Sequence, residues 1–220
     1  LEGLPLYQKK ILITAGPTYE AIDPVRFIGN HSSGKMGFEI AKAASNLGAE
    51  VRLITGPTHQ KISSNLITVI PVVSAQEMYE QVHQFYENCD IAILSAAVAD
   101  YKIKFISNQK IKKEEHSLTL ELEKTQDILA SLGKLKNNQL LVGFALETDN
   151  EITNAIKKLK NKNLDLIVLN SLSDKGAGFG TNTNKVTLIK RDLSTTNFPL
   201  KSKAEVSKDI LNEILKLIDA

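Results

Sequence analysis

The hydrophobic residues of this chain form short apolar runs, separated by longer stretches with helical periodicity. The runs at 91–94 and 140–144 are apolar throughout, which is typical of central strands in a parallel sheet that is covered on both faces. Strands that alternate with amphipathic helices predict an α/β fold, a Rossmann-like, doubly wound and mostly parallel sheet. We expect strands at 10–15, 50–55, 67–72, 90–97, 139–146 and 164–169, and helices at 34–47, 75–88, 126–136, 151–162 and 203–218.

Two regions break this alternation. Within 98–125, a polar, Lys-rich segment precedes 118–123, where apolar residues recur at every second position. That period predicts an added strand in a flap or an interface. Within 170–200, several glycines precede the run 185–190, which we expect to be an antiparallel strand. The predicted fold is therefore a parallel sheet with antiparallel additions.

Composition favours one domain at 9–220, with a flap at about 102–117 and a linker or terminal tail at 1–8. The 220 residues are 42% hydrophobic, enough for one core of ordinary size. No apolar run approaches the ~20 residues that cross a bilayer. The single cysteine excludes an internal disulfide and fits a reducing compartment. A net charge of +2 without a basic arm gives no sign of a nucleic-acid partner. We expect a cytoplasmic protein.

The stretch from Gly29 to Gly37, Gly-Asn-His-Ser-Ser-Gly-Lys-Met-Gly, carries the first candidate chemistry. It lies between the first expected strand and the first expected helix. Backbone N–H groups in the first turn of a helix lack internal acceptors and lie at the positive end of the helix dipole. Ser32, Ser33 and Lys35 add hydroxyl and ammonium donors. The stretch therefore predicts a phosphate site at a helix N-terminus.

Two familiar nucleotide motifs fit this stretch poorly. A P-loop needs Ser or Thr directly after its Gly-Lys pair, where this chain has Met36, and it follows its strand immediately, whereas Gly29 comes thirteen residues after Gly16. A dinucleotide fold needs G-x-G-x-x-G after the first strand and an acid at the end of the second. The run 51–55 ends without an acid. A P-loop NTPase and an NAD-dependent reductase are both disfavoured.

Ligands of doubly wound sheets bind beyond the carboxyl ends of the strands. Small residues at 95–97 would let a flat base approach the backbone there, although tight packing in a crowded core explains them equally well. Segments that follow the expected strands would form one crevice with the 29–37 loop: 14–16, 55–56, 95–100, 144–147 and Asn170.

Several motifs in this order resemble phosphopantothenoylcysteine synthetase, a family of coenzyme A biosynthesis. The resemblance runs from about Lys9 to the final helix. It is carried by Ile13-Thr-Ala-Gly-Pro-Thr18, Asp23-Pro-Val-Arg-Phe-Ile-Gly-Asn-His-Ser-Ser-Gly-Lys-Met-Gly37, Ala96-Ala-Val-Ala-Asp-Tyr101, Lys110-Ile-Lys-Lys113, Gly143-Phe144 with Glu147-Thr148, and Asn163-Leu-Asp-Leu-Ile167.

The resemblance implies a C–N bond-forming ligase with two half-reactions. The carboxylate of 4′-phosphopantothenate attacks the α-phosphate of CTP, giving an acyl-cytidylate and pyrophosphate. The amine of cysteine then displaces CMP. Mg²⁺ would bridge phosphate oxygens, with Asp100 as a candidate contact and no dedicated protein cage. The choice between CTP and ATP stays open.

The family also implies a homodimer in which residues of one subunit close the site of the other, with 118–123 as the candidate exchanged element. In many bacteria this unit is fused to a flavin-dependent decarboxylase. No flavin is expected on this chain, and no membrane partner.

The resemblance assigns catalytic roles to three residues. Asn30 would hold the acyl-nucleotide through its side-chain amide, with Arg26 one helical turn before it. Lys110, on the mobile flap, would neutralise phosphate charge. Read alone, Asn30 is better explained as a turn residue that tolerates left-handed geometry, and only its place in this motif favours the functional role. The nucleotide-binding positions implied are Ser32, Ser33, Gly34, Ser95, Ala96, Asp100, Lys110, Asp127, Ile128, Phe144, Lys158 and Lys162.

Departures from the family pattern limit this assignment. A family Asn-Pro-Asp-Ile segment reads Thr125-Gln126-Asp127-Ile128 here. Loss of the proline changes the backbone at a turn expected to contact the nucleotide. A nucleotide-binding sensor without catalysis is the alternative function, and retention of both Arg26 and Asn30 argues against it.

Overall fold

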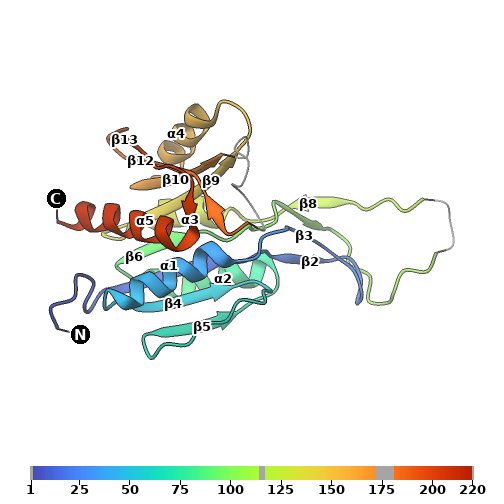
Figure 1. The fold of residues 1–220 in the computed structure, drawn as a ribbon. Helices are drawn as coiled ribbons and strands as arrows, with labels where there is room; N and C mark the ends of the chain where they lie inside the picture. The colour runs from blue at the N-terminus through green and yellow to red at the C-terminus, as the bar shows by residue number, and fades with distance from the viewer. Residues whose placement is uncertain (1, 114–116, 172–180, 220) are drawn as a thin grey trace.

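An eight-stranded sheet in the order β13-β12-β10-β9-β6-β1-β4-β5 forms the centre of the computed structural model, which describes residues 2–113, 117–171 and 181–219 (Figure 1). The six strands from β10 to β5 run parallel, and β12 and β13 join antiparallel at one edge. The predicted fold class is confirmed. The strands are β1 (Lys10–Ala15), β4 (Glu50–Thr55), β5 (Ile67–Pro71), β6 (Ile91–Leu94), β9 (Leu140–Glu147), β10 (Leu166–Ser171), β12 (Val186–Lys190) and β13 (Thr195–Asn197).

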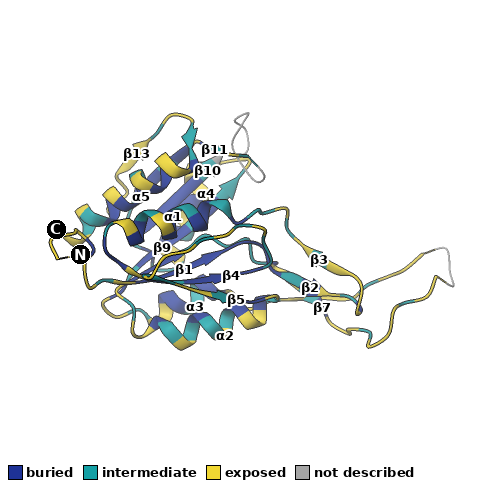
Figure 2. Ribbon diagram, turned by 60° about the horizontal axis from the view of Figure 1, so that its bottom comes forward, coloured by how far each residue is buried: buried dark blue, intermediate teal, exposed yellow. Residues whose placement is uncertain are grey.

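Helices cover both faces of the sheet. Successive strand residues point to opposite faces, so Ile11 and Ile13 pack in one hydrophobic cluster with α1 and α5, while Leu12 packs in a second cluster with α2, α3 and α4. The strands are accordingly buried between two helical layers (Figure 2). The five expected helices are present as α1 (Lys35–Asn46), α2 (Ala75–Tyr86), α3 (Ile128–Leu135), α4 (Glu151–Asn161) and α5 (Lys203–Ile218).

Two antiparallel strand pairs extend from the carboxyl end of the sheet (Figures 1 and 2). A hairpin of β2 (Tyr19–Ala21) and β3 (Phe27–Gly29), which the sequence analysis did not predict, lies next to a pair of β7 (Tyr101–Ile103) and β8 (Leu122–Lys124). We call residues 101–113 and 117–124 the arm. A third small pair joins β11 (Thr183–Asn184) to β14 (Lys201–Ser202).

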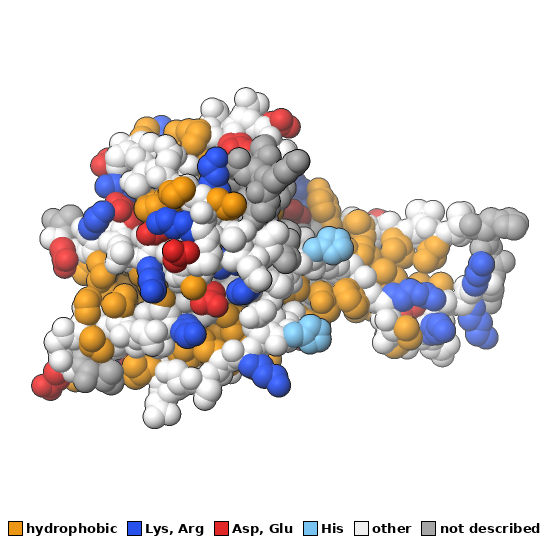
Figure 3. Space-filling view, in the orientation of Figure 1, with side chains coloured by type: hydrophobic (Ala, Val, Ile, Leu, Met, Phe, Trp, Pro, Cys, Tyr) orange, Lys and Arg blue, Asp and Glu red, His pale blue; other side chains and the backbone are white. Residues whose placement is uncertain are grey.

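The arm corrects two expectations. The strand predicted at 118–123 is wrong in its bounds. Only Leu122–Lys124 forms a strand, and it pairs with Tyr101–Ile103. The alternating pattern failed here because its apolar side chains, including Leu118 and Leu122, are exposed and have no sheet to pack on. Arg26 does not lie one helical turn before Asn30, since β3 is extended between them. In the space-filling view, hydrophobic side chains gather on the part of the projection nearest the sheet, and basic side chains lie on its outer half (Figure 3).

The terminal segment expected to be a linker or tail contributes to the core. Leu6 is fully buried in the α1 cluster, and its amide donates to the carbonyl of Leu47 at 2.9 Å. Gly48, at φ 93°, turns the chain where α1 ends and leaves room for Leu4. In the described part of the chain, no helix is both long and apolar enough to cross a membrane.

Replacement of Leu6 by Ala should therefore lower the free energy of unfolding by about 2–4 kcal/mol, because it leaves a cavity in the core. Urea denaturation measures this change. Leu4→Ala is the matched control: its side chain is 36% exposed, and we expect a loss under about 1 kcal/mol. Equal losses for the two variants would contradict an anchored N-terminal segment.

Candidate active site

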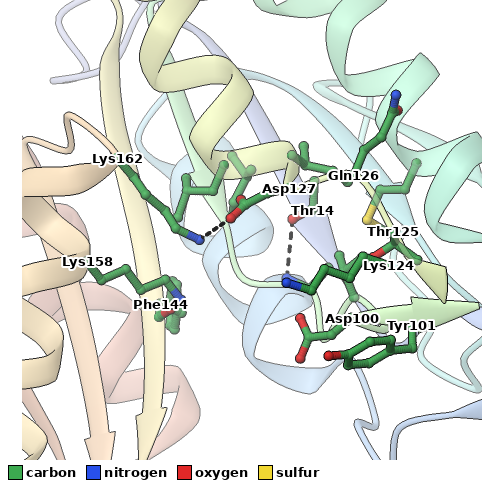
Figure 4. A pocket seen from close by; sticks show the side chains of 16 residues that line it. Thr14, Asp100, Tyr101, Lys124, Thr125, Gln126, Asp127, Phe144, Lys158 and Lys162 are labelled. Carbon is green, nitrogen blue, oxygen red and sulfur yellow. Dashed lines mark hydrogen bonds and ion pairs between the residues drawn. The ribbon is translucent and has the colours of Figure 1, made fainter. Parts of the chain in front are cut away.

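Two adjoining cavities open at the carboxyl ends of β1, β6 and β9, where the sequence analysis placed the crevice. The first, of about 460 Å³, lies between β6, β9, α3 and the root of the arm (Figure 4). The second, of about 340 Å³, lies at the start of α1. The two share wall residues from the segment after β6, from β9 and from α4, so two ligands bound there would touch. The shared residues are Ala96, Val98, Asp100, Phe144 and Lys158.

The second cavity contains the predicted anion site. Gly34 precedes α1 in the left-handed conformation, at φ 78°, which favours glycine. The hydroxyl oxygens of Ser32 and Ser33 accept hydrogen bonds from the amides of Gly34 and Lys35, at 3.2 and 3.4 Å. Those two amides are therefore engaged within the turn. The donors best placed for an anion are the serine hydroxyl protons and the next first-turn amides.

A close approach of backbone to backbone brings this helix start to the sheet. A Cβ at Gly37 would lie 2.5 Å from Cβ of Ala15 and 2.8 Å from Oγ of Ser95. Only glycine permits this contact between the first turn of α1 and the ends of β1 and β6. The Ser32–Gly34 turn, which the sequence predicts to bind an anion, consequently lies directly beside the segment that follows β6.

The segment 95–97 offers fewer donors than expected. The amide of Ala96 donates to Oγ1 of Thr14 at 3.2 Å, and the amide of Ala97 donates to the Gly16 carbonyl at 2.9 Å. The amide and hydroxyl of Ser95 both donate to the Thr14 carbonyl. A base beside Ser95 and Ala96 would therefore meet their carbonyl oxygens rather than their amides.

Asn30 lines the second cavity as predicted. It follows β3 directly, and its Nδ2 donates to the Ala97 carbonyl at 2.9 Å. This bond orients the carboxamide and uses one of its two N–H groups. The second N–H and the carbonyl oxygen of the amide could bind a ligand.

Lys158 and Lys162 lie one turn apart on α4 and its C-cap and point into the first cavity (Figure 4). Nζ of Lys158 donates to the Phe144 carbonyl at 2.6 Å. Burial lowers the pKa of Lys158, and the charge of Lys162 lowers it further. Lys162 itself pairs with Asp127 at 2.7 Å. Lys124 lines the same cavity, so three lysines face it, which favours an anionic ligand.

The turn that lacks the family proline keeps a defined geometry. Asp127 is the N-cap of α3, and its Oδ1 accepts from the Ala130 amide at 2.9 Å. Burial raises the pKa of Asp127, but hydrogen bonds from Lys162 and Ala130 outweigh it and lower the pKa overall. Thr125 ties the turn to the segment that follows β6, since its hydroxyl donates to the Ala99 carbonyl at 2.6 Å. Ile128, the first residue of α3, is buried in the core and also lines the first cavity.

Arg26 and Lys110 do not join the other predicted site residues. Among the described residues that line the two cavities, neither is present. The guanidinium of Arg26 pairs with Asp23 at 2.9 Å and donates to the Ile111 carbonyl. Lys110 is exposed on the arm, which projects away from the sheet (Figure 1). Lys110, the lysine expected on the flap, therefore lies outside both cavities of its own chain.

The sequence analysis missed two basic residues, Lys124 in the wall of the first cavity and Lys203 in the wall of the second. Lys203 opens α5, is only 4% exposed and lines the second cavity with Lys35. Burial lowers the pKa of Lys203, and the charge of Lys35 lowers it further. Burial and the positive end of a helix both disfavour a cation, so this position suits an anionic ligand in the cavity that Lys203 lines. A lysine at the first position of a predicted helix was the signal in the sequence that could have identified Lys203.

No group of three or more His, Cys, Asp or Glu side chains within 2–113, 117–171 and 181–219 could hold a metal ion. Asp100 lines both cavities. One carboxylate suits an ion that takes its other ligands from water and phosphate oxygens.

Comparisons with known proteins place this geometry in context. A family model described as DNA/pantothenate metabolism flavoprotein C-terminal domain matches residues 6–218. The chain is 54% identical over 215 residues to a cysteine/cysteine sulfinic acid decarboxylase from an unknown prokaryotic organism, covering 97% of the chain and 60% of that protein. It is 50% identical over 213 residues to the coenzyme A biosynthesis bifunctional protein CoaBC of Bacillus subtilis (strain 168), covering 97% of the chain and 52% of that protein.

A crystal structure of the C-terminal domain of CoaBC matches the fold with a TM-score of 0.84 and 44% identity, covering 99% of both chains. The chain spans between half and two thirds of the length of those two curated relatives.

Replacement of Lys158 by Met should raise the free energy of unfolding at neutral pH by about 1 kcal/mol, because it removes a partly buried charge. The folded-state pKa of Lys158 lies below its ordinary value of 10.5. The folded chain therefore holds this proton less tightly than the unfolded chain, and the wild type regains stability as pH rises through the folded pKa. The difference between variant and wild type should shrink over that range.

Urea denaturation between pH 7 and pH 10 measures this effect. Lys157→Met, at an exposed neighbouring position, is the control and should show neither the gain nor its pH dependence. A loss of stability in Lys158→Met at pH 7 would contradict an unfavourable buried charge.

Proposed function

Because the chain belongs to the DNA/pantothenate metabolism flavoprotein C-terminal domain family, we propose that it is a phosphopantothenate–cysteine ligase of coenzyme A biosynthesis. It joins the carboxylate of 4′-phosphopantothenate to the amine of cysteine at the expense of CTP. The observation that carries this proposal is the pair of adjoining cavities, one beginning at the Ser32–Gly34 turn before α1 and the other lined by three lysines. A reaction that brings two anions together needs such an arrangement.

In the first half-reaction, a carboxylate oxygen of phosphopantothenate forms a bond to the α-phosphorus of CTP, and the bond to the pyrophosphate oxygen breaks. Positive groups must offset the charge on the phosphoryl oxygens as this occurs. We assign that role to the Ser32–Gly34 turn, to Lys158 and Lys162, and to Lys110 once the arm is in place. Mg²⁺, when bound to the triphosphate, would supply further charge neutralisation, with Asp100 as its protein contact.

In the second half-reaction, the amine of cysteine attacks the acyl carbon, the bond to the CMP oxygen breaks and the amine loses a proton. The mixed anhydride must stay in place until cysteine arrives. We assign this to Asn30, whose carboxamide is oriented by the Ala97 carbonyl and keeps one N–H for a phosphate or acyl oxygen. The Ser95 and Ala96 carbonyls suit the exocyclic amino group of cytosine.

Incubation with CTP, Mg²⁺, phosphopantothenate and cysteine should release one pyrophosphate for each amide formed. A coupled pyrophosphate assay with mass spectrometry of the product measures both. Parallel reactions with ATP decide the base preference, and we expect the higher kcat/KM with CTP. CTP binding without pyrophosphate release would favour the nucleotide-sensor alternative and contradict the ligase.

We further propose that the chain acts as a homodimer in which the arm completes the partner's site. Lys110 lies outside its own chain's cavities, and the arm exposes Phe105, Ile106 and Leu118 to solvent. Exposed apolar side chains that gather on one projection are typical of an interaction surface. In such a dimer each arm would cover the other subunit, so that the Lys110 of each subunit reaches the site of its partner.

Mixing two inactive variants tests this arrangement. Asn30→Asp places a negative charge beside the acyl-nucleotide phosphate, and Lys110→Gln removes the flap charge, so each alone should lose most activity. If Lys110 serves the partner's site, random exchange of subunits leaves about a quarter of the sites with both wild-type residues. Pyrophosphate release by the re-equilibrated mixture measures this recovery, with each variant mixed with itself as control. No recovery despite subunit exchange would contradict a shared site.

A further inference from the structure

The carboxylate of Asp23 joins the β2–β3 hairpin to the arm. Its Oδ1 accepts from the amides of Val25 and Arg26, each at 2.8 Å. Its Oδ2 accepts from the Ile111 amide at 3.1 Å and from Nη1 of Arg26 at 2.9 Å. The side chain is fully buried. One carboxylate therefore closes its own turn and also holds an amide of the arm.

Arg26 completes the contact from the other side of Ile111. Its guanidinium donates to the Ile111 carbonyl at 3.3 Å while it pairs with Asp23. Both peptide groups that flank Ile111 are thus held, one through its N–H and the other through its carbonyl oxygen. A peptide unit is planar, so fixing the Ile111 amide also fixes the plane that begins at the carbonyl of Lys110.

The rest of the arm root supports the same contact. The amide of Ser107 donates to the Ile22 carbonyl at 3.1 Å, so the arm meets the hairpin on both sides of Lys110. Burial alone would raise the pKa of Asp23, but hydrogen bonds from Ile111, Val25 and Arg26 lower the pKa overall. Asp23 is consequently an ionised acceptor at neutral pH, and four N–H groups converge on it.

We propose that Asp23 is a positioning residue for Lys110: it sets the backbone from which the Lys110 ammonium reaches the transferring phosphoryl group. This inference rests on the proposed function, which gives Lys110 its role. Without these hydrogen bonds the backbone at Lys110 would be mobile, and its ammonium would adopt many orientations. Correct orientation of the reacting groups contributes much of the rate in such catalysis. Nucleotide binding, which uses the cavities, would be little affected.

Asp23→Asn isolates the contact to the arm. Asparagine keeps an acceptor oxygen for the turn and forms such turns readily, but its NH₂ group replaces the acceptor that faces Ile111 and Arg26. Hydrogen exchange of the Ile111 amide, followed by ¹⁵N NMR, should accelerate about tenfold as a charge-assisted hydrogen bond is lost. Exchange of the Val25 and Arg26 amides should change much less.

Kinetics then separates positioning from general damage. For pyrophosphate release, kcat should fall about tenfold while the KM for CTP stays within about twofold, the same split that we expect for Lys110→Gln. Asp192→Asn is the matched control, because that carboxylate also closes its own turn, through Ser194, but belongs to the β12–β13 loop. It should change neither readout.

Each other result overturns the inference. Unchanged exchange at Ile111 in Asp23→Asn means that the carboxylate does not hold the arm. Faster exchange with an unchanged kcat means that the contact exists but does not position Lys110. A parallel loss of kcat, CTP binding and thermal stability indicates a purely structural role. A wild-type protein that releases no pyrophosphate overturns the proposed function and the positioning role with it, whatever the exchange rate.

Discussion

The close approach of α1 to the carboxyl end of β1 is the contact on which the site depends. At Gly37 there is no space for a side chain between the helix and Ala15. Because the helix starts there, its unpaired first-turn amides point at the crevice rather than at solvent. Three of the residues that the two cavities share, Asp100, Phe144 and Lys158, are within reach of a ligand bound to that turn because the start of α1 packs directly against the ends of β1 and β6.

Electrostatics follows from that packing. The chain has a net charge of only +2, yet Lys35, Lys158, Lys162 and Lys203 all line the two cavities. Burial lowers the pKa of Lys158 and of Lys203. Their charged forms are therefore unfavourable in the folded protein, because they lose solvation and are repelled by neighbouring lysines. An anionic ligand removes part of that cost when it binds. The buried lysines therefore lower the folding stability of the ligand-free protein and increase its affinity for an anionic ligand.

Sequence patterns predicted the central sheet well because its strands are apolar on both faces, as the runs at 91–94 and 140–144 show. The hairpin at 19–29 escaped prediction, since each of its strands has three residues and pairs only locally. At the site, the Ser32–Gly34 turn was readable because its residues are adjacent in sequence. The helix start at Lys203 was readable too, but its place beside the turn was not, because about 170 residues separate the two. The position of Arg26 was mistaken because a spacing of four was read as helical.

The hairpin is also the element that connects the arm to the site. β3 ends at Gly29, the next residue is Asn30, and the anion turn follows without a break. A Cβ at Gly29 would lie 2.6 Å from the Tyr19 ring, which stacks on Phe27 with centroids 3.9 Å apart. Such packing leaves the hairpin little freedom to bend. The arm root and Asn30 are therefore joined through this one packed hairpin. The residue proposed to hold the acyl intermediate and the lysine proposed to help form it are linked through one short, tightly packed pair of strands.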